Sequence, residues 1–168
     1  MLELDAWLKI AKSAALEGGN YLLQNQGKEL KVLMDSGRDI KLQLDTDTEK
    51  LIKESLSSQS SFSILGEETG LSNNLGEFYW VVDPLDGTSN FLRGIPISCV
   101  SIALMQNVTP ILGVIYDFNH DNLYFGHIES QAFVNHEEIV VSDYANKSQA
   151  TLVTGIPAKT KYSDSEFK

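Results

Sequence analysis

The chain has 168 residues, of which 42% are hydrophobic and 21% are charged. This is a globular composition, and the length is sufficient for one domain with a core. The formal net charge is −10, from 13 basic and 23 acidic side chains. A negative field repels a phosphate polymer and attracts cations, so we expect no nucleic-acid partner.

The cysteine content and the apolar runs indicate a cytoplasmic protein without membrane contact. Cys99 is the only cysteine, so an internal disulfide is excluded, and its apolar surroundings predict a small core residue. The N-terminal stretch with Glu3 and Asp5 has no apolar block and does not resemble a signal peptide. No apolar run reaches membrane-spanning length.

Helices are expected in the first third of the chain. Residues 2–26 have one apolar stripe at helical spacing, formed by Leu4, Leu8, Ala11, Ala15, Gly18 and Leu22. The Asp35-Ser36-Gly37 cluster predicts a turn between two short strands. Residues 45–59 predict a second helix, with a capping box from Thr46 to Glu49.

Short strands are expected in the rest of the chain. They fall at 62–68, 78–83, 98–106, 109–117, 122–129, 131–135, 138–142 and 151–157, and most are separated by turn residues. This spacing favours a largely antiparallel sheet. Two helices followed by many strands predict an α+β fold, with the two N-terminal helices packed on one face of the sheet.

The segment "WVVDPLDGTSNF" holds the strongest functional signal. Pro84 cannot donate to a sheet, so the strand ends at Asp83 and a turn follows. Asp83, Asp86 and a turn carbonyl are hard oxygen ligands that suit Mg²⁺, and helix-start amides near Thr88 suit a phosphate. Together these groups fit phosphoryl transfer. The plain alternative is a favourable turn in which Asp86 bonds its own backbone.

Two further acidic segments strengthen the functional interpretation. "LGEE" places Glu67 and Glu68 after a strand, where a solvated loop entry is the simpler explanation. "LDTDTEK" places Asp45 at the start of the second helix, where an N-cap is the simpler explanation. Three acidic element ends in one small domain can converge on one site.

The three segments together resemble the inositol monophosphatase family. "DPLDGTSNF" is similar to its first signature, "LGEE" to its Gly-Glu-Glu element, and "LDTDTEK" to the segment before its second helix. The family consists of Mg²⁺-dependent, lithium-sensitive phosphomonoesterases with a layered αβαβα sandwich. The resemblance therefore implies that residues 1–150 form the N-terminal α+β metal-binding domain, the first half of that sandwich, and that 151–168 begin a second domain.

The resemblance also implies a set of metal ligands. Glu67, Asp83 and the carbonyl of Leu85 would bind the first Mg²⁺. Asp83 and Asp86 would bind a second one. The family's second signature, which completes that second site, is not found in these residues, so we expect weak second-metal binding and a poor or inactive phosphatase.

The remaining roles concern water and substrate. Thr88, oriented by Asp45, would act with Glu67 to position and deprotonate a water. Asp86 and the amides of Gly87 and Thr88 would contact the small phosphorylated substrate. Glu68 would either support this site or simply be exposed.

Several alternatives stay open from the sequence. The leading substrate is an inositol monophosphate, which Ser89-Asn90-Phe91 favours. The alternatives are a 3′-phosphoadenosine 5′-phosphate nucleotidase, a sugar or histidinol phosphatase, or a non-catalytic metal- or phosphate-binding module. Because helices are expected on one sheet face only, we also expect self-association into a homo-oligomer.

The remaining aromatic and histidine side chains have simpler explanations. No two of the three histidines have metal-ligand spacing, so His120, His127 and His136 are interpreted as surface residues. Trp7 and Trp80 are interpreted as core or interface aromatics.

Overall fold

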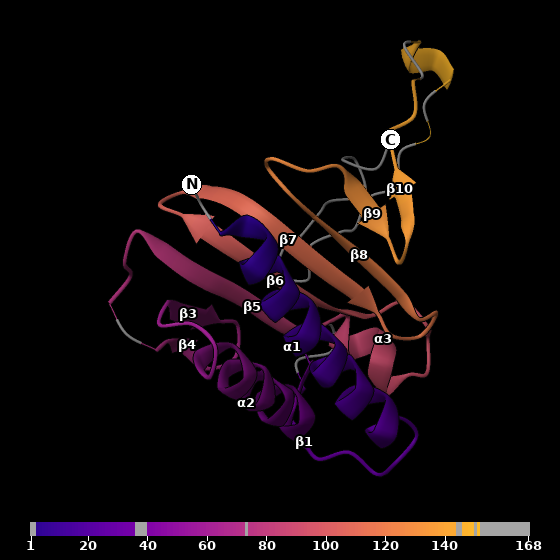
Figure 1. Cartoon of the computed structure of the whole chain (residues 1–168). Helices are drawn as coiled ribbons and strands as arrows, with labels where there is room; N and C mark the ends of the chain where they lie inside the picture. The colour runs from indigo at the N-terminus through magenta and orange to yellow at the C-terminus, as the bar shows by residue number, and fades with distance from the viewer. Residues whose placement is uncertain (1–2, 36–39, 73, 144–145, 150, 152–168) are drawn as a thin grey trace, which may run out of the picture.

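The structure is a computed structural model that describes residues 3–35, 40–72, 74–143, 146–149 and 151. This part of the chain contains three α-helices and ten strands, followed by a short 3₁₀ helix. Figure 1 shows how they are arranged. In chain order they are α1 (Leu4–Asn25), β1 (Val32–Asp35), β2 (Ile40–Leu42), α2 (Gln43–Ser57), β3 (Ser63–Gly66), β4 (Gly70–Leu71), β5 (Phe78–Asp86), α3 (Thr88–Leu92), β6 (Cys99–Gln106), β7 (Thr109–Asp117), β8 (Asn122–His127), β9 (Ala132–Val134), β10 (Glu137–Ile139) and η1 (Lys147–Gln149).

Eight of the strands form one sheet in the order β10-β9-β8-β7-β6-β5-β3-β4. Every neighbouring pair is antiparallel except β3 and β5, which run parallel. The strands β1 and β2 form a separate antiparallel pair. The predicted α+β fold with a largely antiparallel sheet is therefore confirmed.

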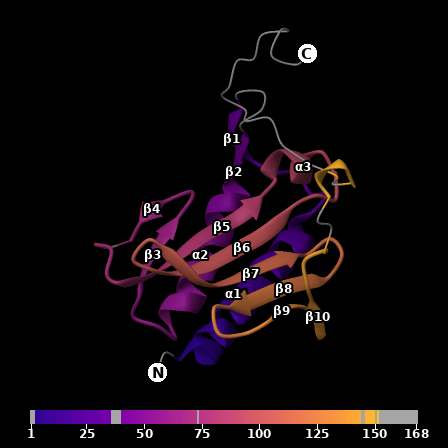
Figure 2. The ribbon, with the colours of Figure 1, turned by 90° about the horizontal axis from the view of Figure 1, so that it is seen from above.

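The two long helices lie side by side against one face of the sheet (Figures 1 and 2). The stripe predicted for the first helix is buried there. Gly19 lets α1 approach the sheet closely, because a Cβ at this position would lie only 2.4 Å from the Tyr116 ring. Trp80 is also buried in this layer and donates from its indole nitrogen to the Ser60 hydroxyl at 2.8 Å, while Trp7 packs against neighbouring rings. Both tryptophans belong to the core region, as expected.

The opposite sheet face is not covered by a helix of the described residues (Figure 2). One row of paired residues crosses this open face from β5 to β8. Asp83 pairs with Ser101, Ser101 with Ile115, and Ile115 with Tyr124. Ile115 and Tyr124 are both exposed large side chains. This open face therefore carries apolar surface at its centre and the Asp83 carboxylate at one end of the row.

Several local expectations were wrong. Helix α2 begins at Gln43 rather than Asp45, and the capping group is the Asp45 carboxylate, which accepts the Leu42 amide, so Thr46 and Glu49 do not form the predicted capping box. Cys99 is not a core residue: it is half-buried and lines a pocket. His127 is not a surface residue, because its side chain is only 7% exposed.

The C-terminal expectations are met only in part. Strand β10 ends at Ile139, and Val140 and Val141 beyond it are exposed instead of continuing the predicted strand. Of the strand expected at 151–157, only Thr151 lies within the described residues, and it is in no strand. The predicted domain boundary at 150 also lies outside the described residues. None of the helices in the described part of the chain is long and apolar enough to cross a bilayer.

Candidate metal and phosphate site

The parallel pairing of β3 and β5 brings two acidic residues to the same edge of the sheet. Gly66 at the end of β3 pairs with Val82 in β5, and the amide of Glu67 donates to the Val82 carbonyl at 3.0 Å. The next residues along the two strands are therefore neighbours, and these are Glu67 and Asp83. An antiparallel pairing would have placed them at opposite ends.

A buried carboxylate on helix α2 anchors the loop that carries Glu67. Glu49 is fully buried and accepts the backbone amides of Glu68 at 2.7 Å and Thr69 at 3.1 Å. It also accepts the Thr69 hydroxyl and pairs with Lys53 at 3.0 Å. Burial by itself would raise the pKa of Glu49, but the hydrogen bonds from Thr69 and Glu68 and the charge of Lys53 lower it.

Gly66 completes this anchor, since a Cβ there would lie 2.4 Å from the Glu49 carboxylate. No larger residue fits at the end of β3 without moving Glu49. The sequence reasoning missed the role of Glu49, because Glu49 and Lys53 have the spacing of an ordinary surface pair on a helix.

The predicted strand end at Asp83 is wrong, because β5 continues to Asp86 with an irregularity in its pairing with β6 between Asp83 and Asp86. Side chains of this segment bond to its own backbone. The Leu85 amide donates to the Asp83 carboxylate at 3.1 Å, and the Thr88 hydroxyl donates to the Leu85 carbonyl at 3.1 Å. Helix α3 begins at Thr88, as predicted, with Gly87 before it in the left-handed region at φ 91°. A Cβ on Gly87 would lie 2.7 Å from the Ile97 carbonyl oxygen, so glycine is required for both conformation and space.

Asp83 lies in an environment that opposes its negative charge. Burial, a hydrogen bond with Glu67, the Glu67 charge and the Asp86 charge raise the pKa of Asp83 to about 8, against the opposing effect of the Leu85 amide. Crowded carboxylates of this kind are stabilised by a bound cation, because it favours their ionised forms. Asp86 itself is exposed, and its carboxylate lies 3.9 Å from the Cys99 sulfur.

Asp45 is the other unusual carboxylate of this region. It is 1% exposed, its Oδ2 accepts the Leu42 amide at 2.8 Å, and its Oδ1 has no hydrogen-bond partner among the described residues. Burial, followed by the charges of Glu68 and Glu67, raises the pKa of Asp45 to about 7 despite the opposing Leu42 amide and Lys41 charge. Capping of helix α2 explains the hydrogen bond to Asp45 Oδ2, but it gives no role to Asp45 Oδ1.

Two expected contacts take a different form. The Thr88 hydroxyl donates to Leu85 rather than to Asp45 among the contacts of the described residues. The side chain of Glu68 is largely buried and accepts from Lys41 at 3.2 Å, so plain exposure does not describe it.

An Mg²⁺ ion fits the donors at this edge of the sheet. No group of three or more His, Cys, Asp and Glu side chains within the described ranges is arranged to hold a metal. However, Mg²⁺ keeps several waters and is commonly bound by one or two carboxylates. The neighbouring carboxylates of Glu67 and Asp83 meet that requirement with oxygen donors alone, and the raised pKa of Asp83 is the effect that a cation would offset.

The chain matches proteins of known class over nearly its whole length. The model of the inositol monophosphatase family matches residues 3–166. A fructose-1,6-bisphosphatase/inositol-1-monophosphatase from Aquifex aeolicus is 36% identical over 164 residues, which cover 96% of this chain and 62% of that protein.

Solved structures agree with this match. The SuhB extragenic suppressor protein from Bartonella henselae has a TM-score of 0.75 and 35% identity, over 80% of this chain and 54% of the other. An inositol monophosphatase from Anabaena has a TM-score of 0.72 and 36% identity, over 84% and 52%.

The fold of this chain is therefore the α+β fold of these solved structures. The chain belongs to the inositol monophosphatase family. It spans between about half and two thirds of the length of the relatives named above.

Proposed function

We propose that the protein hydrolyses a small phosphomonoester with the help of Mg²⁺ bound at the Glu67–Asp83 edge. The observation that carries this proposal is the parallel register of β3 and β5, which makes two carboxylates neighbours beside a glycine turn. The all-oxygen donor set favours Mg²⁺, Mn²⁺ or Ca²⁺ over zinc or copper.

The chain's own residues supply binding and orientation. Glu67, Asp83 and the Leu85 carbonyl would hold the first cation, and Asp83 with Asp86 would hold a second one. When bound, the cation lowers the pKa of a water and neutralises phosphate charge.

The turn and helix α3 contribute the remaining groups. The amides of Gly87 and Thr88 would hold the phosphate, because the first amides of a helix have no partner within it. The Thr88 hydroxyl can rotate from the Leu85 carbonyl toward the attacking water. The Oδ1 of buried Asp45, which has no partner in the described part of the chain, is a candidate acceptor for the Thr88 hydroxyl proton. Such a protein, with one free thiol, would work in a reducing cytoplasm.

An inositol monophosphate is the first candidate substrate, by family membership. The Aquifex relative is named for fructose 1,6-bisphosphate as well, which makes a sugar bisphosphate the second candidate. A nucleotidase and a non-catalytic binding module remain the alternatives to these.

Phosphate release from inositol 1-phosphate, fructose 1,6-bisphosphate and 3′-phosphoadenosine 5′-phosphate, with Mg²⁺ or with EDTA, tests the proposal. Asp83→Asn should abolish Mg²⁺-dependent release and weaken Mg²⁺ binding in calorimetry. Asp47→Asn is the matched control, since Asp47 is an exposed carboxylate on α2. Mg²⁺ binding without release of phosphate from any substrate would favour the binding-module alternative, and binding unaltered by Asp83→Asn would place the metal elsewhere.

A further inference from the structure

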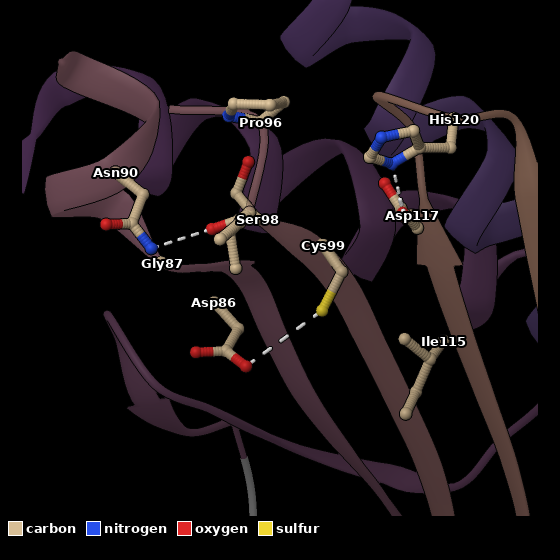
Figure 3. Close-up of a pocket in the computed structure, with 10 residues that line it drawn as sticks. Asp86, Gly87, Asn90, Pro96, Ser98, Cys99, Ile115, Asp117 and His120 are labelled. Carbon is tan, nitrogen blue, oxygen red and sulfur yellow. Dashed lines mark hydrogen bonds and ion pairs between the residues drawn. The ribbon is translucent and has the colours of Figure 1, made fainter. Parts of the chain in front are cut away.

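A pocket of about 400 Å³ opens beside the turn that follows β5 (Figure 3). Its walls include Asp86 from the end of β5, Gly87 from the turn, Cys99 from the start of β6 and Ile115 from β7. A phosphate held at Gly87 would therefore have the organic part of its ester within reach of this pocket. The side chains that line the pocket opposite Gly87 would then determine which organic parts of a substrate can bind.

One of these side chains is a histidine in a fixed orientation. His120 Nδ1 lies 2.8 Å from Asp117 Oδ2, and the pair faces Asn90 and Gly87 across the pocket in Figure 3. An ionised carboxylate can only accept, so Nδ1 carries the proton and Nε2 is the nitrogen left for another partner. The other Asp117 oxygen accepts the Asn119 amide at 3.1 Å, which orients the carboxylate in turn.

The loop that holds this pair is fixed at both ends. The Asn119 side-chain amide donates to the carbonyl and to the hydroxyl of Ser98, each at 3.1 Å, and Ser98 is buried. The Tyr116 hydroxyl donates to Asp121 at 2.9 Å on the other side of the loop. The position of His120 is therefore set by the loop as well as by Asp117.

The chemistry of the pocket favours a hydroxyl over a second anion. Among the described residues that line the pocket, His120 is the one whose side chain can be cationic, and the Asp117 carboxylate lies beside it. Asp86, which lines the pocket next to Gly87, adds a negative charge to it. A hydroxyl both donates and accepts, so it pairs with Nε2 whether the imidazole is neutral or protonated.

We propose that His120, held by Asp117, binds a hydroxyl of the substrate's organic part and so selects polyol phosphates over phosphomonoesters without hydroxyls. This inference rests on the proposed function. Within it, His120 is a specificity-determining residue and Asp117 is a positioning residue.

The test compares two unreactive probes in the presence of Mg²⁺. One is the phosphonate analogue of inositol 1-phosphate, and the other is methylphosphonate, which has the anion but no hydroxyl. Affinities are measured by calorimetry for the unaltered chain, His120→Ala, His120→Gln and Asp117→Asn. His136→Ala is the matched control, because His136 is an exposed histidine outside the pocket. Thermal unfolding of each variant checks that it is folded.

His120→Ala should weaken binding of the inositol phosphonate about tenfold, the cost of one lost hydrogen bond, and leave methylphosphonate unchanged within about twofold. Asp117→Asn should weaken the same probe less, because the imidazole stays but loses its fixed orientation. Equal weakening of both probes, or of neither, would overturn the assignment of His120 while leaving the proposed function standing. If the unaltered chain binds neither probe, the proposed function itself is contradicted and this inference falls with it.

Discussion

The carboxylate of Glu49 accepts the backbone amide of Glu68 at 2.7 Å, which ties helix α2 to the loop that follows β3. Glu67 precedes Glu68 in this loop and is a candidate metal ligand. Its position therefore depends on the buried Glu49 side chain, which is not itself a candidate ligand. Glu49 is thus a positioning residue whose loss should be visible first in stability.

Glu49→Gln should lower the free energy of unfolding by about 3 kcal/mol or more, because Lys53 loses its charged partner in a mostly buried place. Urea denaturation measures the change. The control is Glu54→Gln on the same helix, where the ion pair with Lys50 is exposed and the expected change is within about 0.5 kcal/mol. Similar decreases in the free energy of unfolding for the two variants would show that Glu49 stabilises the fold no more than an exposed ion pair does.

Gly87→Ala should destabilise the protein more than Gly94→Ala. Both glycines have positive φ, at 91° and 69°, so each substitution carries the left-handed strain of about 1 kcal/mol or more. At Gly87 the new Cβ would also meet the Ile97 carbonyl oxygen. At Gly94 no atom of the described residues lies within 4 Å of the position that a Cβ would take. Urea denaturation compares the two variants, and equal losses would mean that the close approach at Gly87 relaxes without cost.

The free energy of unfolding in EDTA should fall as the pH rises from about 4 to about 8. Asp83 and Asp45 have folded-state pKa values raised to about 8 and about 7 from the ordinary aspartate value of 3.8. The folded state therefore binds more protons than the unfolded state across this window. Their stabilising contribution is complete below the unfolded pKa and is lost as the pH passes through the folded pKa.

Asp83→Asn should flatten this pH dependence, while Asp47→Asn should leave its slope unchanged. Saturating Mg²⁺ should oppose the fall, since the cation favours ionised Asp83. Denaturant midpoints at pH 5 and pH 8 are enough to compare the variants. A slope that Asp83→Asn does not change would show that other groups, including general repulsion in a chain of net charge −10, account for it.

Thr88→Ala should leave Mg²⁺ affinity unchanged and lower turnover by about 10²-fold, because it removes the hydroxyl proposed to orient the attacking water. It should also cost about 1 kcal/mol of stability through the lost hydrogen bond to Leu85. Thr88→Ser keeps the hydroxyl and serves as the control in the same steady-state assay. Full turnover in the alanine variant would remove Thr88 from the mechanism.

The chain should self-associate through the open face of the sheet. Ile115 and Tyr124 pair across β7 and β8 there, and both are exposed. Ile115→Lys should lower the mass found by light scattering, whereas Val108→Lys should not, although Val108 in the β6–β7 turn is the more exposed of the two. A monomeric unaltered chain at high concentration would contradict this expectation.

The sequence predicted the elements whose signals are local. The apolar stripe of α1 and the helix start at Thr88 depend on neighbouring residues, and both are found. The strand end predicted at Asp83 is not found, because β5 continues past Pro84 to Asp86. The parallel pairing of β3 with β5 was not predicted, because no local pattern shows that residues 67–77, which include β4, return the chain to run beside β3 in the same direction. The pairing depends on long-range contacts rather than on neighbouring residues, and it makes Glu67 and Asp83 neighbours.

Two misplaced residues had a signal in the sequence that was not used. Val100, Ile102 and Leu104 alternate with Cys99, Ser101 and Ala103, so the period of two already assigns Cys99 to the less buried face. The same period groups His127 with Leu123 and Phe125 on the helix-covered face. By contrast, no local pattern reveals that Glu49 is buried, since its partners are backbone amides 19 and 20 residues away.

The register between β3 and β5 also determines where the chain can change length. Residues 74–77 before β5 are exposed, and Leu75 is half-exposed to solvent. An insertion between Leu75 and Gly76 would enlarge this loop and leave the pairing of Gly66 with Val82 intact. One added residue inside β3 or within 78–82 would instead turn each following side chain to the other sheet face, and Glu67 would no longer adjoin Asp83.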